Sequence, residues 1–186
     1  MGFDPLLLAR RTADEAHRSI GQVRKGSGAP YITHCEAVAD WVREAGGTHT
    51  MIEAAYLHDT LEDTPLSEKD ILADFGPVVL ELVKGVTAIS KPEDGNRATR
   101  KAIDLKHYAS GDARMQTIKL ADIVDNLSDI TTLDPKFAEV YLWEKYELAW
   151  ALTKGATELR ERALELCLKH IKQLGLPIDS PHASNF

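Results

Sequence analysis

The chain has 186 residues, of which 44% are hydrophobic and 27% charged, and its formal net charge is −7. These values are typical of a globular protein with a real core, and they exclude a largely disordered chain. The acidic balance argues against a nucleic-acid binder, which would carry a basic face. Two cysteines, Cys35 and Cys167, imply no disulfide framework and fit a reducing cytoplasm, and the apolar stretch over residues 6–9 is too short for a membrane span.

Hydrophobic residues recur at helical spacing along almost the whole chain, so the sequence predicts an all-α bundle of about nine to ten helices. The first helix is expected over residues 4–20 and is followed by a Gly/Pro loop over residues 26–30. Thr33 is the expected N-cap of the next helix, with Glu36 completing a capping box, and Gly46 ends that helix.

A central helix is predicted over residues 50–63, with Pro65 ending it. Six further helices are predicted over residues 67–75, 77–90, 96–109, 113–130, 134–153 and 157–175. The polar tail over residues 177–186 contains two prolines and is expected to be flexible. We therefore expect one domain over residues 1–176, with no second domain.

The central helix carries an unusual group of ionisable residues. His58-Asp59 and Glu62-Asp63 follow a strongly apolar run, so the pattern predicts that they are buried. On a continuous helix His58 would face Glu62, and Asp59 would face Glu62 and Asp63. Three carboxylates and an imidazole in one place would repel one another unless a cation joined them, which indicates a divalent metal. The alternative is an exposed acidic helix end.

Two more segments extend this pattern, because His34 precedes the group and Asp122 follows it on another predicted helix. The order His, His-Asp, Asp on three helices resembles the ligand pattern of the HD phosphohydrolase superfamily. The chain also resembles the hydrolase domain of RelA/SpoT-type proteins, and in particular stand-alone small alarmone hydrolases of the metazoan SpoT-homologue type, over about residues 3–176. The segments that carry this resemblance are Arg24-Lys25, residues 30–34, residues 57–64, Lys119-Leu120-Ala121-Asp122 and Asn126.

The resemblance implies one divalent metal held by four side chains, namely His34, His58, Asp59 and Asp122. It implies Mn(II), although two imidazoles and two carboxylates would also accept Fe(II), Co(II) or Zn(II). Taken singly, His34 could be a capping or core histidine, and Asp122 could be a surface acid on an amphipathic helix. The surrounding motifs favour the metal.

The resemblance further implies hydrolysis of guanosine 3′,5′-bis(diphosphate), ppGpp, or of pppGpp, to pyrophosphate and GDP or GTP. Glu62 and Asp63 would act on the attacking water, since a carboxylate beside a metal-bound water can take its proton. Arg24 and Lys25 would bind the nucleotide, and Asn126 would reach its sugar or base. Three more residues could supply cations to the pyrophosphate or could form a solvated basic face: Arg97, Arg100 and Lys101.

Three positions depart from the family pattern. Cys35 stands where proline is usual, Asp125 where tyrosine or histidine is common, and Ser128 where arginine is common. The last two changes predict a less basic far wall of the pocket, which leaves open an HD-type hydrolase acting on another nucleotide such as NADPH. A non-catalytic nucleotide-binding module is disfavoured by the complete ligand set, and a helical scaffold would leave the buried acids unexplained.

Overall fold

The computed structural model describes residues 4–128 and 135–176, and the predicted all-α fold is confirmed in this part of the chain. An isolated bridge between Val23 and Pro30 is the one β-type pairing among these residues. None of the described helices is long and apolar enough to cross a membrane. The helices are α1 Pro5–Ser19, α2 Ile32–Glu44, α3 His49–Leu57, α4 Thr60–Asp63, α5 Glu68–Val86, the 3-10 helix η1 Pro92–Asp94, α6 Arg97–Ser110, α7 Ala113–Ser128, α8 Pro135–Ala151 and α9 Thr157–Gln173.

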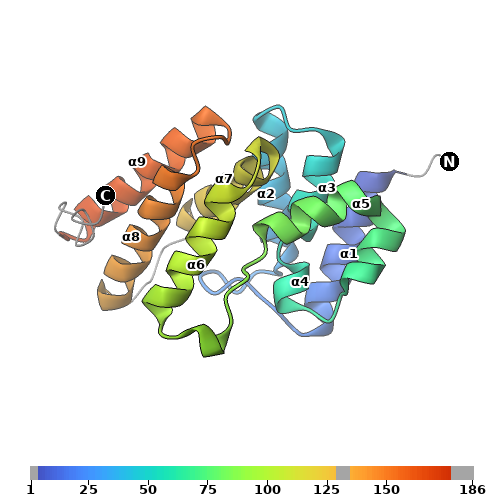
Figure 1. Ribbon diagram of the computed structural model, residues 1–186, viewed down its shortest axis with the longest axis horizontal. Coiled ribbons are helices and arrows are strands. Elements are labelled where there is room, and N and C mark those ends of the chain that lie inside the picture. Colours follow the sequence, from blue (N-terminus) through green and yellow to red (C-terminus); the bar gives the residue numbers. More distant parts are fainter. Residues whose placement is uncertain (1–3, 129–134, 177–186) are drawn as a thin grey trace.

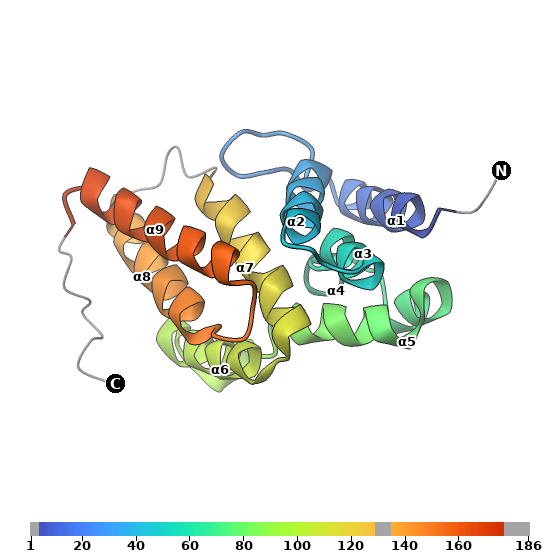
Figure 2. The same cartoon turned by 90° about the horizontal axis from the view of Figure 1, so that it is seen from above.

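Helix α7 is the centre of the molecule. Helices α1 to α5 lie on one side of it and α6, α8 and α9 on the other (Figures 1 and 2). It packs against α2, α3 and α5 on the first side and against α9, α6 and α8 on the second. Residues 116–125 of α7 are all buried, so any charged residue in that stretch lies inside the protein.

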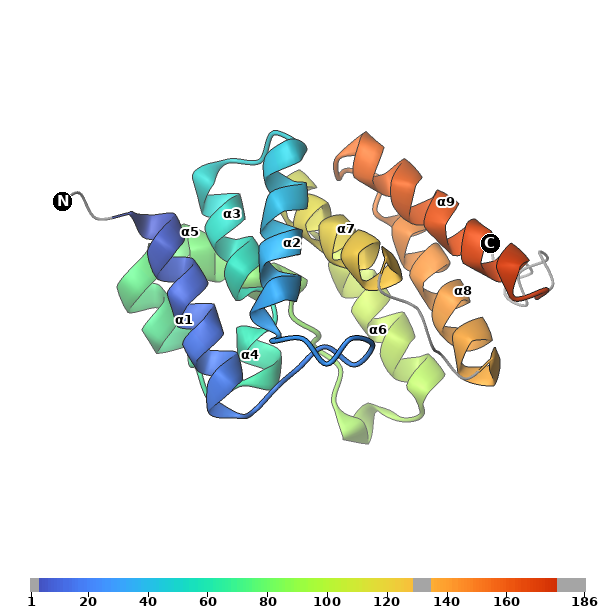
Figure 3. The same ribbon diagram turned by 180° about the vertical axis from the view of Figure 1, so that it is seen from behind.

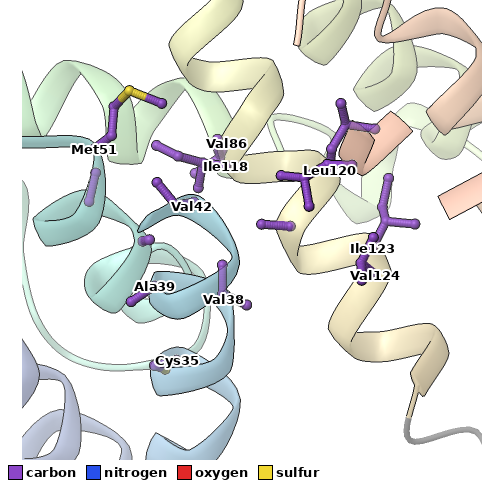
Figure 4. Packing of buried hydrophobic residues seen from close by; sticks show 14 of the residues in the cluster. Cys35, Val38, Ala39, Val42, Met51, Val86, Ile118, Leu120, Ile123 and Val124 are labelled. Carbon is purple, nitrogen blue, oxygen red and sulfur yellow. The ribbon is translucent and has the colours of Figure 1, made fainter. Parts of the chain in front are cut away.

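The hydrophobic core joins α7 to the N-terminal helices (Figure 4). Val42 of α2 lies beside Ile118 of α7, and both side chains are fully buried. Val86, at the end of α5, belongs to the same cluster. Burial of several branched side chains, at about 1.5–3 kcal/mol each, holds α2 and α7 in register, and these two helices carry His34 and Asp122.

The single helix predicted over residues 50–63 is wrong. Helix α3 ends at Leu57, and the chain passes through Asp59 (φ −97°, ψ −4°) before the short helix α4 begins. Side chains satisfy two carbonyls at this end: His58 Nδ1 donates to Ala55 O at 2.8 Å, and Thr60 Oγ1 donates to Leu57 O at 2.7 Å. Because these groups replace the next helical N–H donors, the helix stops here, and the expected i+4 alignment of His58 with Glu62 does not apply.

Two other boundaries differ from the expectation. Helix α2 begins at Ile32 after Tyr31, and Thr33 lies inside its first turn, where its hydroxyl donates to Pro30 O at 2.9 Å. The expected partner Glu36 instead accepts from Arg10 at 2.6 Å. The helix predicted to reach residue 90 ends at Val86. Residues 129–130 and 134 of two predicted helices, and the whole predicted tail over residues 177–186, lie outside the described residues.

The break expected at residue 76 is present as a kink within α5. Gly76 has φ 80° and ψ 176°, a conformation that is essentially restricted to glycine. We expect Gly76→Ala to lower the free energy of unfolding by about 1–3 kcal/mol, because alanine must adopt this strained backbone or straighten the kink. Urea unfolding followed by circular dichroism measures the change. An unchanged midpoint and slope would contradict the positive φ.

Candidate metal centre

Four side chains from three helices and one helix break meet in the interior. His34 lies in the first turn of α2, His58 caps α3, Asp59 follows it, and Asp122 lies on α7. His34 Nε2 lies 3.2 Å from His58 Nε2, 3.6 Å from Asp59 Oδ2 and 3.5 Å from Asp122 Oδ1. His58 Nε2 lies 3.1 Å from Asp59 Oδ2 and 3.9 Å from Asp122 Oδ1. The structure therefore brings together all four residues that were expected to bind the metal.

The hydrogen bonds of the two imidazoles show which ring nitrogens face the centre. His34 Nδ1 contacts Asp125 Oδ2 at 2.6 Å, and His58 Nδ1 contacts Ala55 O at 2.8 Å. Both partners are acceptors, so each Nδ1 carries a proton. The two Nε2 lone pairs of the neutral rings then point at each other and at two carboxylates. Only a cation or an added proton can satisfy this set.

The spacing of these donor atoms fits one divalent metal. With metal–ligand bonds of about 2.1 Å, neighbouring ligands are about 3.0 Å apart in an octahedral site and about 3.4 Å apart in a tetrahedral one. The five distances given above run from 3.1 to 3.9 Å. Nitrogen and oxygen donors in equal number suit a first-row ion. The ligand atoms of His34, His58 and Asp59 all lie within 4.8 Å of one another, and Asp122 lies beside both imidazoles, so these residues fit the group that the family resemblance implies.

The electrostatics of the cluster also favour a positive charge. Burial alone would raise the pKa of Asp59, but the facing imidazoles of His58 and His34 hold it well below its usual range. Burial would likewise raise the pKa of Asp122, and nearby Lys119 holds it well below. The pKa of His34 is raised well above its usual value, since hydrogen bonds to surrounding carboxylates outweigh its burial. The cluster thus attracts a proton where no metal is bound.

Side chains not singled out from the sequence support the two carboxylates. The hydroxyl of Tyr31 donates to Asp59 Oδ2 at 2.5 Å. The buried Lys119 lies with Nζ 3.0 Å from Asp122 Oδ2 and 4.7 Å from the ring centre of Tyr108. Tyr31 and Lys119 both lie in sequence motifs that carry the family resemblance, close in sequence to His34 and Asp122. That closeness was the sequence signal from which a supporting role could have been predicted. Asn126, which was expected to reach the sugar or base of the nucleotide, donates to Asp122 Oδ1 and also lines a cavity beside the cluster.

A cavity of about 860 Å³ opens beside the cluster, which is large enough for a nucleotide. Asp59 and Asp122 line it together with residues of α6 and α8. Four cations line the cavity on these two helices: Arg97, Lys101, Lys106 and Lys145. Lys145 was not predicted from the sequence, where it is one charge among several on α8.

Glu62 and Asp63 also line the cavity, and neighbouring loops orient both. Glu62 Oε2 accepts from the backbone N–H of Ala88 at 3.1 Å. Asp63 Oδ2 accepts from Gln22 Nε2 at 2.7 Å, and Gln22 Oε1 contacts His17 Nδ1 at 2.7 Å. Both carboxylates therefore lie at the cavity, at the side where the metal cluster is found.

The basic residues expected at the nucleotide fall into two groups. Lys101 and Arg97 line the cavity, and Arg97 forms a paired contact with Glu144 at 2.8 and 2.7 Å. Among the described residues that line the cavity, neither Arg24, Lys25 nor Arg100 appears. Arg24 Nη1 lies 2.8 Å from Asp125 Oδ2, Lys25 is exposed, and Arg100 donates to Gly95 O at 2.7 Å.

The three departures from the family pattern occupy different surroundings. Cys35 is fully buried in the core, where burial raises the pKa of its thiol. Ser128 donates to Val124 O at 2.8 Å within α7. Asp125 is buried between His34 and Arg24 and does not appear among the cavity residues. The negative charge at Asp125 therefore does not make the described cavity wall less basic.

Comparison with known proteins gives consistent matches. A family model described as "HD domain" matches residues 9–148. The chain is 34% identical over 175 residues to a probable GTP diphosphokinase RSH3 of Arabidopsis thaliana, covering 90% of this chain and 24% of that protein. It is 36% identical over 126 residues to guanosine-3′,5′-bis(diphosphate) 3′-pyrophosphohydrolase of Haemophilus influenzae, covering 66% and 18%. The chain thus spans about a quarter or less of these relatives.

Solved structures also share the fold, among them two that cover most of this chain. One is described as "A metazoan ortholog of SpoT hydrolyzes ppGpp and plays a role in starvation responses". It superimposes with a TM-score of 0.80 at 28% identity, covering 95% of this chain and 99% of that one. The other is lmo0812 from Listeria monocytogenes, with a TM-score of 0.63 at 25% identity, covering 80% of this chain and 99% of that one. The first likeness extends over nearly the full length of both chains.

Proposed function

The chain belongs to the HD-domain family, and from that membership we propose that it is a metal-dependent hydrolase that removes pyrophosphate from the 3′ position of ppGpp or pppGpp. The observation that carries the proposal is the meeting of two imidazoles and two carboxylates, with both carboxylates lining a nucleotide-sized cavity. The named activity of the metazoan structure, which matches over almost the whole chain, supports the choice of substrate.

In this proposal His34, His58, Asp59 and Asp122 hold Mn(II). Held there, a divalent ion would lower the pKa of a water molecule and would offset negative charge on the phosphate oxygens. The protein supplies the orientation. Tyr31 and Lys119 each bind the carboxylate oxygen of one ligand and so fix where that carboxylate points.

Glu62 and Asp63 handle the proton of the attacking water in this proposal. Their position at the cavity beside Asp59 supports this role. Because the N–H of Ala88 and the amide of Gln22 each bind one carboxylate oxygen, the two groups are held in place before substrate arrives. A carboxylate so placed accepts a proton from the water as the water oxygen bonds to phosphorus and the bond from phosphorus to the 3′-oxygen breaks. The same proton can then pass to the 3′-oxygen, which leaves as a hydroxyl group.

The nucleotide would extend from the metal cluster towards α6 and α8. Lys101 and Arg97 face it there, and Asn126 lies at the metal end. Cations around a phosphate offset its charge most strongly where water is excluded. Arg24, Lys25 and Arg100 remain proposed substrate contacts. Because none of the three is among the described residues that line the cavity, each would have to move to reach a nucleotide bound there. We also propose a cytoplasmic location, which the two buried free cysteines support.

A second candidate is hydrolysis of another phosphorylated nucleotide such as NADPH. The sequence argument for it was the loss of positive charge at Asp125 and Ser128. Since Asp125 is paired with Arg24 and His34, that argument rests on Ser128 alone.

The two candidates predict different products from one substrate panel. The Mn(II)-loaded protein is incubated with ppGpp, pppGpp, GTP and NADPH, and pyrophosphate and phosphate are measured separately. We expect pyrophosphate and GDP or GTP from the first two substrates, with kcat/KM at least 100-fold above that for NADPH, a difference of about 2.7 kcal/mol in transition-state stabilisation. Efficient release of phosphate from NADPH, with intact ppGpp, would replace the first candidate by the second.

A further inference from the structure

We propose that Asp125 is a positioning residue of the metal centre. Its carboxylate fixes the ring of His34, and Arg24 in turn fixes the carboxylate. The loop before α2 is thereby coupled to a metal ligand. The inference rests on the metal site of the proposed function, but it does not depend on which nucleotide is cleaved.

The first step is the way α7 contacts both nitrogens of one imidazole. Asp122 and Asp125 are three residues apart, so they lie on the same face of the helix. Asp125 Oδ2 lies 2.6 Å from Nδ1 of His34, and Asp122 Oδ1 lies 3.5 Å from its Nε2. The carboxylate of Asp125 thus orients the imidazole ring of His34, and the carboxylate of Asp122 lies near the ring nitrogen that would face the metal.

The second step is that a single oxygen atom accepts from both partners. Asp125 Oδ2 also lies 2.8 Å from Nη1 of Arg24. The side chains of His34, Asp125 and Arg24 are 3%, 11% and 12% exposed, so water screens these contacts weakly. Charge-assisted hydrogen bonds in such surroundings are strong, and removal of the Asp125 carboxylate takes away the acceptor that His34 Nδ1 contacts.

The third step connects the ion pair to the loop between α1 and α2. The backbone of Arg24 donates to Ala29 O and accepts from the N–H of Gly28, each at 2.9 Å, which closes a tight turn. The turn lies beside the C-terminal end of α7 (Figures 2 and 3). Arg24 therefore anchors this loop to the same carboxylate that orients His34. A partner of this kind commonly raises metal affinity by fixing the tautomer and basicity of the ligand.

The test measures the affinity of the protein for the metal. If Asp125 served only to bind substrate, its replacement would not change that affinity. Mn(II) dissociation constants are determined by chelator competition for the unmodified protein and for Asp125→Asn, Arg24→Met and the double variant. We expect Asp125→Asn to weaken binding about 10–100-fold, because the neutral amide holds the imidazole less strongly. Arg24→Met should weaken it severalfold, and the double variant should fall short of the sum of the two free-energy changes because the residues act through one contact.

Asp74→Asn is the matched control, since Asp74 is an exposed acid on α5. It should bind Mn(II) as the unmodified protein does. The visible spectrum of bound Co(II) gives a second readout, and it should change in Asp125→Asn and not in Asp74→Asn. A dissociation constant for Asp125→Asn within twofold of the unmodified protein would overturn the inference.

If Asp125→Asn fails to fold, as judged by circular dichroism, Arg24→Met decides the matter, and unchanged affinity in that variant overturns the coupling. The proposed function can fail separately: protein that binds Mn(II) normally but leaves ppGpp intact would overturn the substrate and keep Asp125 in its role.

Discussion

Asp59→Ala is expected to lose bound metal and hydrolase activity together. Asp59 Oδ2 lies 3.1 Å from Nε2 of His58 and 3.6 Å from that of His34, so its removal deletes one of four donors and one of two negative charges. The loss of affinity should exceed the roughly 10–100-fold effect of losing a supporting partner. Metal content after gel filtration and pyrophosphate release from ppGpp measure the two effects.

Asp74→Ala removes an exposed carboxylate from α5 and serves as the control for charge and purification. It should retain both metal and activity. Asp59→Ala protein that kept a full equivalent of metal would show that Asp59 is not a ligand. A folded variant is required for this reading, and circular dichroism of the metal-free forms supplies that check.

Glu62→Gln is expected to keep the metal and to lower kcat by about 10²–10⁴-fold, the range for a lost general base. Glutamine has the same shape, and its amide oxygen can still accept from the N–H of Ala88, so the loop after α5 should not move. What disappears is the ability to take a proton from water. Steady-state hydrolysis of ppGpp and metal content are measured on the same preparation.

Glu68→Gln is the matched control, because Glu68 lies on the surface paired with Lys84 at 2.8 Å. Its kcat should equal that of the unmodified protein. Loss of metal from Glu62→Gln would place Glu62 among the ligands, and an unchanged kcat would remove it from the proton transfer.

That His34, His58, Asp59 and Asp122 meet could be predicted from the sequence because each stands in a short motif, but the backbone that joins them could not. His58 and Asp59 were placed on a helix continuing to residue 63, whereas the helix ends at Leu57. The cause is local competition: the side chains of His58 and Thr60 occupy backbone carbonyls that a continuing helix would use. Helix propensity and hydrophobic spacing do not report such contacts.

The surroundings of the ligands were harder to predict, since they depend on contacts between distant segments. Asp125 was interpreted as a change in the pocket wall, yet it lies between Arg24 and His34, residues 101 and 91 positions earlier in the chain. Lys145 joins the cavity only because α8 packs beside α6 and α7. Arg24 and Arg100 show the opposite case, in which a cation expected at the substrate forms a contact within the protein.

The most direct test of the central claim is pyrophosphate release from ppGpp by protein stripped of metal with a chelator, with and without added Mn(II). The account predicts no release from the stripped protein and restoration at about one equivalent of Mn(II) per chain, as expected for a single site with four ligands. Release at an unchanged rate without metal would contradict it, and so would intact ppGpp when Mn(II) is shown to be bound.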